Sequence, residues 1–462
     1  MLMIVLDNTV VNVALPSIQS DLGFSQSSLA WVVNAYMIAF GGLLLLAGRL
    51  GDLIGSRRVF IAGLVTFTLA SLLCGVAWTR ELLVAARFVQ GLGGAMASSV
   101  ILAMIVTMFE EGEERAKAMG VFSFTAAAGG SIGLLLGGTL TQVVNWHAIF
   151  LINVPIGIAA TIMALRLLAS GNGIGLREGA DALGASLVTA SLMLAVYTVV
   201  EIPTYGAGSA HTWGLGAIAV VLFVAFIARQ ATAIKPLLPL RVFRSRNVAG
   251  SNLMQLFLVA GLFGFFFLEA LYLRRVLGYN AVTTGLAFLP ITLAIGALSL
   301  GWAARLSTRF EPRAVAIAGL GLAAGGLAVF AFAPLDANYL TTSLPAMLLL
   351  GVGMGIAFPP VMTFAMSSAT SSDAGLISGL INTTAQVGGA FGLAVLATLS
   401  ATRTRDLLAA GSTKPVALAA GYHLAFGIGA GCLVIALIIA ATVLQSASHQ
   451  ESATDTARSA IA

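Results

Sequence analysis

Three ionisable residues, Asp7, Arg87 and Glu269, fall inside long apolar segments of the chain. A charged group deep in a membrane costs roughly 2.5–3.5 kcal/mol on insertion scales, so each of the three is a candidate functional residue. A buried guanidinium stabilises a nearby carboxylate and lowers its proton affinity, whereas desolvation raises that affinity. A carboxylate held between these two effects can load and release a proton, and we expect proton coupling to be the chemistry of this set.

Each residue also has a purely structural interpretation. Asp7 could cap a helix or hydrogen-bond Asn8 or Asn12, and Arg87 could form a static ion pair or extend its side chain to the membrane surface. Glu269 precedes two arginines by five and six residues, which places it near an outer vestibule. For Glu269 a coupling or cation-binding role and a solvated structural pair fit the sequence equally well.

The composition is that of a polytopic membrane protein. Apolar residues make up 59% of 462 positions, charged residues 9%, and the mean hydropathy is +1.00, whereas average chains carry about 25% charged residues. The net charge of +5 is scattered through short loops, so it does not indicate nucleic-acid binding. The four histidines are far apart, and the glycine-rich segment 351–355 lacks a P-loop lysine. We therefore expect no metal, no nucleotide and no other cofactor besides protons.

Apolar runs predict fourteen membrane helices. Their approximate limits are 1–20, 28–48, 59–78, 82–108, 118–143, 148–169, 183–201, 213–231, 249–273, 283–303, 314–333, 342–366, 376–399 and 418–445. With the N-terminus inside, cytoplasmic segments hold fifteen Lys and Arg residues and external segments six, which favours cytoplasmic termini. Counting back from Pro16 leaves fifteen residues, fewer than the roughly 20 of a full span, so the first helix is predicted to be truncated.

A weak internal repeat, in which residues 48–63 align loosely with 301–319, predicts two similar halves. Repeated halves with a site at their interface are the usual architecture of secondary transporters. We predict an N-terminal six-helix bundle at 1–170, two inserted helices with a cytoplasmic loop at 171–246, a C-terminal six-helix bundle at 247–446 and a polar cytoplasmic tail at 447–462.

A charged hairpin at 48–58 carries the first specific resemblance. It resembles the loop between helices 2 and 3 of the major facilitator superfamily, whose pattern G-x-L-a-D-r-x-G-r-K/R is matched at Gly48, Leu50, Asp52, Gly55 and Arg57. Arg58 follows, and the two arginines hold the loop at one membrane face. By this resemblance the hairpin is a gating loop that latches the inner side against the other bundle.

Two further motifs narrow the resemblance to the drug:proton antiporter-2 branch, the fourteen-helix multidrug exporters. Residues 6–16 are similar to its helix 1 motif l-D-x-T-v-v-n-v-A-L-P, and residues 87–95 to its helix 4 motif R-x-x-x-G-x-g. The resemblance implies the major facilitator fold and makes Asp7 the leading proton-coupling carboxylate.

Glycines are expected to form helix-packing faces. Gly129, Gly133 and Gly137 recur every four residues, which leaves one helix face without side chains and lets another helix approach closely. The segment resembles the exporter motif G-x-x-x-G-P-x-x-G-G, with Leu134 in place of the proline. Gly91 and Gly138 complete the predicted packing set.

The expected function is proton-coupled efflux of small amphipathic or cationic molecules, such as a drug, antibiotic or secondary metabolite, by alternating access. We expect a non-enzymatic monomer in the bacterial cytoplasmic membrane that binds no nucleic acid. A facilitator, a proton-driven metabolite importer or a non-transporting sensor are the alternatives. The predicted substrate-cavity residues are Gln90, Phe263, Phe265, Phe266, Met362, Asn382 and Gln386.

Overall fold

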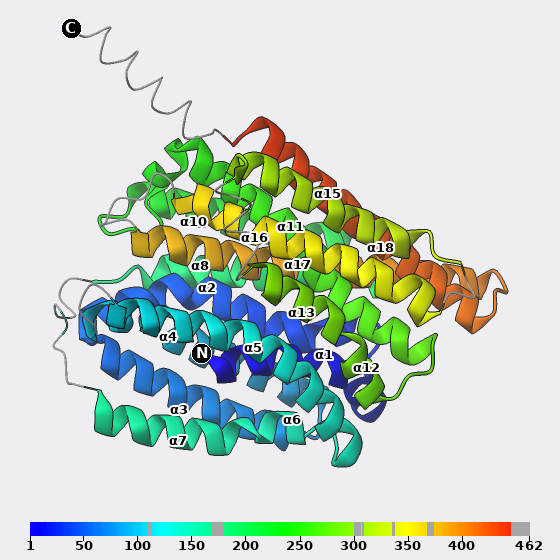
Figure 1. Ribbon diagram of the computed structural model, residues 1–462, viewed down its shortest axis with the longest axis horizontal. Coiled ribbons are helices and arrows are strands. Elements are labelled where there is room, and N and C mark those ends of the chain that lie inside the picture. Colours follow the sequence, from blue (N-terminus) through cyan, green and yellow to red (C-terminus); the bar gives the residue numbers. More distant parts are fainter. Residues whose placement is uncertain are drawn as a thin grey trace, which may run out of the picture.

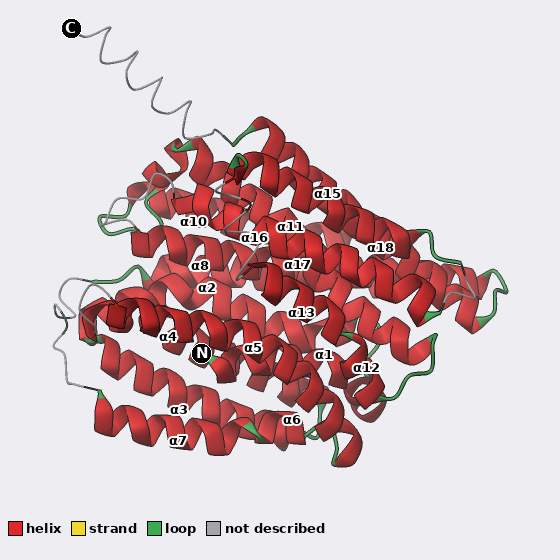
Figure 2. Ribbon diagram, viewed as in Figure 1, coloured by secondary structure: helices red, strands yellow, loops and turns green. Residues whose placement is uncertain are grey.

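The computed structural model describes residues 1–108, 113–168, 179–299, 309–334, 338–366 and 374–444, together with 173, 175 and 306. The regular elements in these ranges are all helical (Figure 2). The polar tail at 447–462 lies outside the described residues.

The first half of the chain forms one bundle, in the lower part of Figure 1. Its helices are α1 (Leu2–Leu22), η1 (Ser28–Ala30), α2 (Trp31–Ile54), α3 (Ser56–Gly75), α4 (Arg80–Met108), α5 (Glu113–Val143), α6 (Ala148–Leu151) and α7 (Asn153–Leu167).

The last part of the chain forms the second bundle, in the upper part of Figure 1. Its helices are α11 (Arg246–Arg275), α12 (Ala281–Ala287), α13 (Leu289–Ala297), α15 (Pro312–Ala331), η5 (Tyr339–Ser343), α16 (Leu344–Met366), α17 (Ala374–Ala409) and α18 (Lys414–Thr442). Among the described residues, twelve helices are long and apolar enough to cross a membrane. Two shorter apolar helices, Ile132–Val143 and Ala281–Ala297, lie at the expected fifth and tenth positions, which is consistent with fourteen spans.

The first helix differs from its prediction. Pro16 lies inside α1, which continues to Leu22 and has 21 residues, the length that a membrane span requires. The prediction of a truncated helix was wrong in its premise, because a proline weakens a helix but does not always end it when neighbouring helices hold the segment in place.

Two further helices, α8 (Ala182–Val200) and α10 (Ala210–Thr232), connect the halves through the short elements α9 (Ile202–Tyr205) and η3 (Leu240–Arg244). Helix α8 packs against α2 of the first bundle and α17 of the second, while α10 packs on α8. The inserted pair therefore adjoins both bundles.

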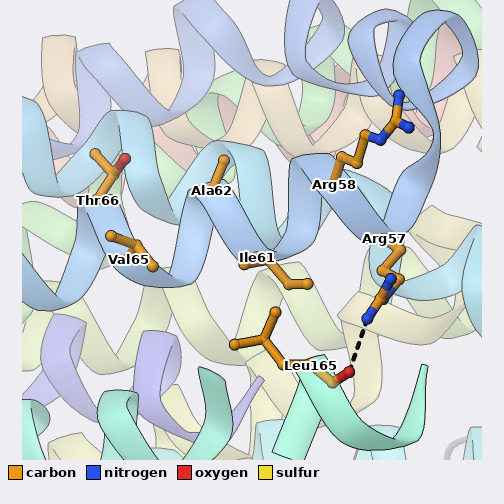
Figure 3. A pocket seen from close by; sticks show the side chains of 7 residues that line it. All are labelled: Arg57, Arg58, Ile61, Ala62, Val65, Thr66 and Leu165. Carbon is orange, nitrogen blue, oxygen red and sulfur yellow. Dashed lines mark hydrogen bonds between the residues drawn. The ribbon is translucent and has the colours of Figure 1, made fainter. Parts of the chain in front are cut away.

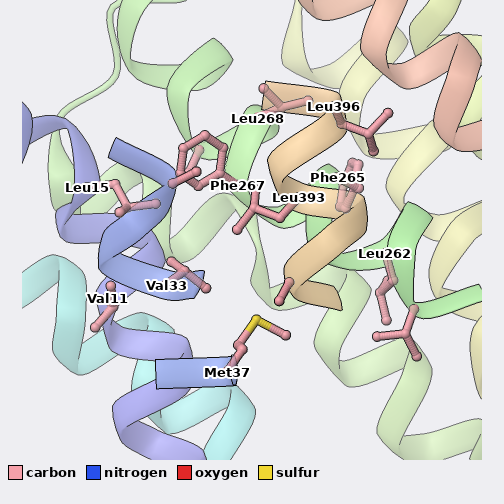
Figure 4. Packing of buried hydrophobic residues seen from close by; sticks show 14 of the residues in the cluster. Val11, Leu15, Val33, Met37, Leu262, Phe265, Phe267, Leu268, Leu393 and Leu396 are labelled. Atoms are coloured by element: carbon pink, nitrogen blue, oxygen red, sulfur yellow. The ribbon is translucent and has the colours of Figure 1, made fainter. Parts of the chain in front are cut away.

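The inner apolar contact between the bundles joins α1 and α2 to α11 and α17. Figure 4 shows side chains from these four helices meeting there: Val11, Leu15, Val33, Met37, Leu262, Phe265, Phe267, Leu268, Leu393 and Leu396. This contact is almost free of directional bonds, so the bundles can repack without breaking many hydrogen bonds.

Asp181 fixes the start of α8 to α10. Its carboxylate accepts hydrogen bonds from the Gly184 amide (3.0 Å), from Arg229 Nε (3.0 Å) and from Gln230 Nε2 (2.8 Å). Gln230 Oε1 in turn accepts from the Leu238 amide at 3.0 Å. Desolvation raises the pKa of Asp181, but the hydrogen bonds and the charge of Arg229 together outweigh it and hold the pKa below its ordinary value.

Replacing Asp181 tests this anchor. Because the folded-state pKa is depressed, its stabilisation is present above the ordinary value of 3.8 and is lost as the pH falls through the lower folded-state value. We expect Asp181→Asn to lower the free energy of unfolding in detergent by about 1–3 kcal/mol at pH 7, with the difference from the native chain closing only below pH 3.8. Asp52→Asn, at a 65% exposed side chain, should cost less than about 1 kcal/mol. Equal losses in both variants would contradict a buried anchor.

The glycines of α5 face α1. A Cβ atom on Gly129 would contact Val5, one on Gly133 would collide with Thr9, and one on Gly137 would lie 2.7 Å from the Val10 carbonyl oxygen. Gly138 faces elsewhere, toward the Ala281 carbonyl of α12 in the second bundle (2.6 Å). The predicted small-residue face thus holds α5 against α1 at close range.

Gly137→Ala and Gly130→Ala form a matched pair on this helix. Both substitutions raise helix propensity equally, but a Cβ at Gly130 meets nothing within 4 Å. We expect Gly137→Ala to be less stable than Gly130→Ala by about 1–3 kcal/mol in detergent thermal unfolding, since backbone would have to move. Indistinguishable melting curves would rule out a tight α1–α5 contact.

Candidate functional site

A buried ion pair joins α1 to α4. Arg87 Nη1 lies 2.5 Å from Asp7 Oδ2, and the exposed fractions of the two side chains are 1% and 0%. The other carboxylate oxygen of Asp7 accepts hydrogen bonds from Gln90 Nε2 (2.7 Å) and Asn153 Nδ2 (2.8 Å). Two of the predicted coupling residues are therefore in direct contact, and donors from α4 and α7 complete the shell of the carboxylate.

The guanidinium of Arg87 is held on its other sides by α2 and α6. Its Nε donates to the Val32 carbonyl oxygen at 2.9 Å. The Tyr36 and Phe150 rings lie 4.5 and 5.6 Å from its central carbon, which stabilises the cation through the ring faces. A buried arginine that keeps its charge needs such a complete set of partners.

Gln90 connects the pair to α3. Its amide oxygen accepts from Arg87 Nη1 at 2.6 Å, and its amide nitrogen donates to Ser71 Oγ at 2.8 Å. Gln90 is completely buried, so it belongs to this network and its predicted place in a substrate cavity was wrong. Asn12 bonds the Asn8 carbonyl of its own helix and does not serve as the partner of Asp7.

Small residues allow the helices to converge on this point. A side chain at Gly91 would collide with the Tyr36 carbonyl of α2, and one at Gly93 would lie 2.5 Å from the Phe67 amide nitrogen of α3. The glycines that follow Arg87 in α4 therefore bring α2 and α3 within reach of its guanidinium.

Glu269, the third predicted coupling residue, lies apart from this network on α11. It is 0% exposed, and neither carboxylate oxygen has a hydrogen-bond partner of normal geometry among the described residues. The expectation of a solvated pair was wrong, because α11 continues to Arg275 and the second bundle encloses Glu269. Its neighbours include the hydroxyl-bearing residues Ser343, Tyr272 and Tyr339.

The other predicted cavity residues lie in different surroundings. Phe265 is buried among the rings of Phe266, Phe288, Phe330 and Phe426, so it packs the second bundle. Phe263, Phe266 and Gln386 are partly buried, whereas Asn382 and Met362 are exposed. A shared substrate cavity for these five remains a prediction.

The predicted gating hairpin contacts the segment that leads into α8. Gly175 donates its amide proton to the Leu53 carbonyl oxygen (3.0 Å), and Arg49 Nε donates to the Gly179 carbonyl oxygen (3.4 Å). Gly55 has a positive φ of 98° and separates α2 from α3. Among the hairpin residues, Arg49 and Asp52 form an exposed pair at 3.8 Å. The latch against the second bundle stays a prediction.

Polar ties join the bundles at the end opposite this hairpin. Arg274 Nη1 donates to Ser17 Oγ (2.9 Å), Gln26 Nε2 to Ser400 Oγ (3.2 Å), and the Val282 amide to Gln142 Oε1 (3.2 Å). The Leu134 carbonyl oxygen packs against Gly285 nearby. The sequence gave no signal for these contacts, because each partner lies far away along the chain.

Comparison with known proteins identifies the family. The family model described as Major Facilitator Superfamily matches residues 1–393. The chain belongs to this superfamily. It is therefore a multi-pass membrane transporter and not an enzyme.

Its relatives include proteins of antibiotic producers. The chain is 38% identical to a puromycin resistance protein of Streptomyces alboniger, covering 99% of this chain and 92% of that protein. It is also 38% identical to a cephamycin export protein of Amycolatopsis lactamdurans, over 96% and 90% of the two chains. The fold resembles an inward-facing bacterial homologue of the lysosomal transporter Spinster, with a TM-score of 0.69, 16% identity and coverage of 96% and 95%.

The ion pair can be tested by a double-mutant cycle. Arg87→Gln or Asp7→Asn alone leaves a buried charge without its partner and should cost about 3–5 kcal/mol of unfolding free energy. The double variant carries no buried charge and should regain part of this loss. Additive losses in detergent unfolding would contradict direct coupling between the two residues.

Proposed function

We propose that this member of the major facilitator superfamily exports small amphipathic or cationic molecules, of the antibiotic or secondary-metabolite class, in exchange for protons. The observation that carries the proposal is the fully buried Asp7–Arg87 pair. Resistance and export functions among its relatives support the direction and the substrate class.

Asp7 is the proposed proton carrier. Protonation neutralises the carboxylate, and Arg87 then loses its ionic partner while the bonds to Val32 and Gln90 remain. The hold of α4 on α1 weakens as a result. Helix α1 also contacts the glycine face of α5 and the apolar surface of α11, so its release acts directly at the junction of the two bundles.

Glu269 is proposed as a second exchangeable carboxylate in the other bundle. An ionised carboxylate without a partner is costly to bury, whereas the neutral acid is far less so. Its ionised form would be a natural partner for a cationic substrate that reaches α11. Exchange of one proton for a neutral substrate at about 100 mV gains roughly 2.3 kcal/mol, and each pH unit adds about 1.4 kcal/mol.

We further propose that the protein acts as a monomer in a bacterial cytoplasmic membrane, with both termini inside. The distribution of Lys and Arg in the sequence supports this orientation. The polar ties of Arg274, Gln26 and Val282 would then close the external side, and alternating access would require them to break.

Reconstitution tests the exchange. In proteoliposomes with an imposed pH gradient, puromycin or ethidium should drive proton flux through the native protein. Asp7→Asn should lose pH-driven accumulation by at least about tenfold, while counterflow of labelled substrate against unlabelled substrate persists, since counterflow needs no net proton movement. Asp21→Asn, at a carboxylate bonded to Trp146 and outside the Asp7 network, is the matched control.

The outcomes separate the alternatives. Substrate movement that ignores the pH gradient would make the protein a facilitator, and uptake in the direction of proton flow would make it an importer. Loss of counterflow together with accumulation in Asp7→Asn would assign Asp7 to folding or substrate binding and remove it as the coupling residue.

A further inference from the structure

A groove lies between α3 and α7 on the outer side of the first bundle, with a volume of about 520 Å³. Figure 3 shows its lining residues, which are Arg57, Arg58, Ile61, Ala62, Val65, Thr66 and Leu165. None of them takes part in the Asp7 network, so the groove needs an explanation of its own.

The lining of α3 follows helical spacing. Residues 57, 58, 61, 62, 65 and 66 repeat as adjacent pairs every four positions, which places them along one side of a helix. Val65 is 40% exposed and Leu165 of α7 is 51% exposed. This side of the transporter therefore faces the lipid, and the lower part of the groove is apolar.

The upper end of the groove is basic. Arg57 Nη2 donates to the Leu165 carbonyl oxygen at 2.7 Å, a group in the last turn of α7 that has no partner within its own helix. This bond holds the Arg57 side chain between the two helices, while Arg58 extends from the same turn of α3 in another direction (Figure 3). Both guanidinium groups lie at the N-terminus of the 20-residue α3, whose dipole adds to their positive potential.

The order of these groups matches a phospholipid. Two guanidinium groups at the helix end suit a phosphate, which arginine binds with a planar pair of donors. The apolar residues of the following two turns suit an acyl chain that runs toward the membrane centre. Basic pockets between membrane helices commonly take anionic headgroups. We propose that this groove binds one anionic phospholipid, with its phosphate at Arg57 and Arg58 and an acyl chain along Ile61, Val65 and Leu165.

Native mass spectrometry of the detergent-purified protein provides the test. Dioleoyl phosphatidylglycerol is titrated against dioleoyl phosphatidylcholine, which has the same acyl chains and no net charge. The native protein should retain one phosphatidylglycerol with an affinity at least about tenfold above that for phosphatidylcholine. Equal retention of the two lipids would overturn the proposal.

Charge removal is compared between two double variants. Arg57→Gln/Arg58→Gln should lower phosphatidylglycerol affinity by about tenfold or more. Arg166→Gln/Arg241→Gln removes the same net charge at two exposed arginines that do not line the groove, and it should change the affinity less than about threefold. An equal loss in both would mean that the lipid responds only to overall charge, and the groove would not be its site.

A second pair of variants tests the apolar part without touching the hairpin. Val65→Trp fills the groove and should lower phosphatidylglycerol binding several-fold, whereas Leu69→Trp, one turn further along α3 at a 57% exposed position, should not. Unchanged binding in Val65→Trp would overturn the acyl-chain assignment. Displacement of the lipid by millimolar inorganic phosphate would instead indicate a free-phosphate site and reject the lipid.

Discussion

The charge of Arg87 is the constraint on which the first bundle depends. A guanidinium that is 1% exposed in a membrane protein must find its donors' partners within the protein. It finds them on three helices, at Asp7 of α1, at the Val32 carbonyl of α2 and at Gln90 of its own helix. The glycines at 91 and 93 follow from this requirement, because larger residues would keep α2 and α3 too far from α4 for these bonds to form.

This arrangement gives α1 a central position. One face carries Asp7 toward α4, a second packs on the glycines of α5, and Val11 and Leu15 face the second bundle. A change in the charge of Asp7 alters only the first of these contacts. The apolar junction with α11 and α17 has few directional bonds to break, so a modest change in free energy at Asp7 is sufficient to shift how the bundles pack. The polar ties at Arg274 and Gln26 are few and lie at one end, where they can open as a group.

The sequence predicted the helices and the family well, since apolar runs and local motifs carry that information. It also predicted that Asp7 and Arg87 matter. It did not predict that Asn153 and Ser71 join them, because these residues lie far apart along the chain and have no local signature. Glu269 was misplaced for a related reason: the nearby arginines indicated a solvated helix end, but packing within the second bundle decides burial. Pro16 was taken as a helix end, although tertiary contacts carry α1 past it.

Helix α3 relates the network to the membrane. Ser71 on one face bonds Gln90 inside the bundle, while Arg58 and Val65 on another face line the outer groove. A helix is stiff along its axis, so a lipid that holds the arginine end of α3 restrains the same element that supports the donor of Asp7. Lipid composition would then alter the rate at which the bundles exchange conformation without any change in the contacts of the ion pair. Substrate and proton need not be the only molecules that set the conformational equilibrium of this transporter.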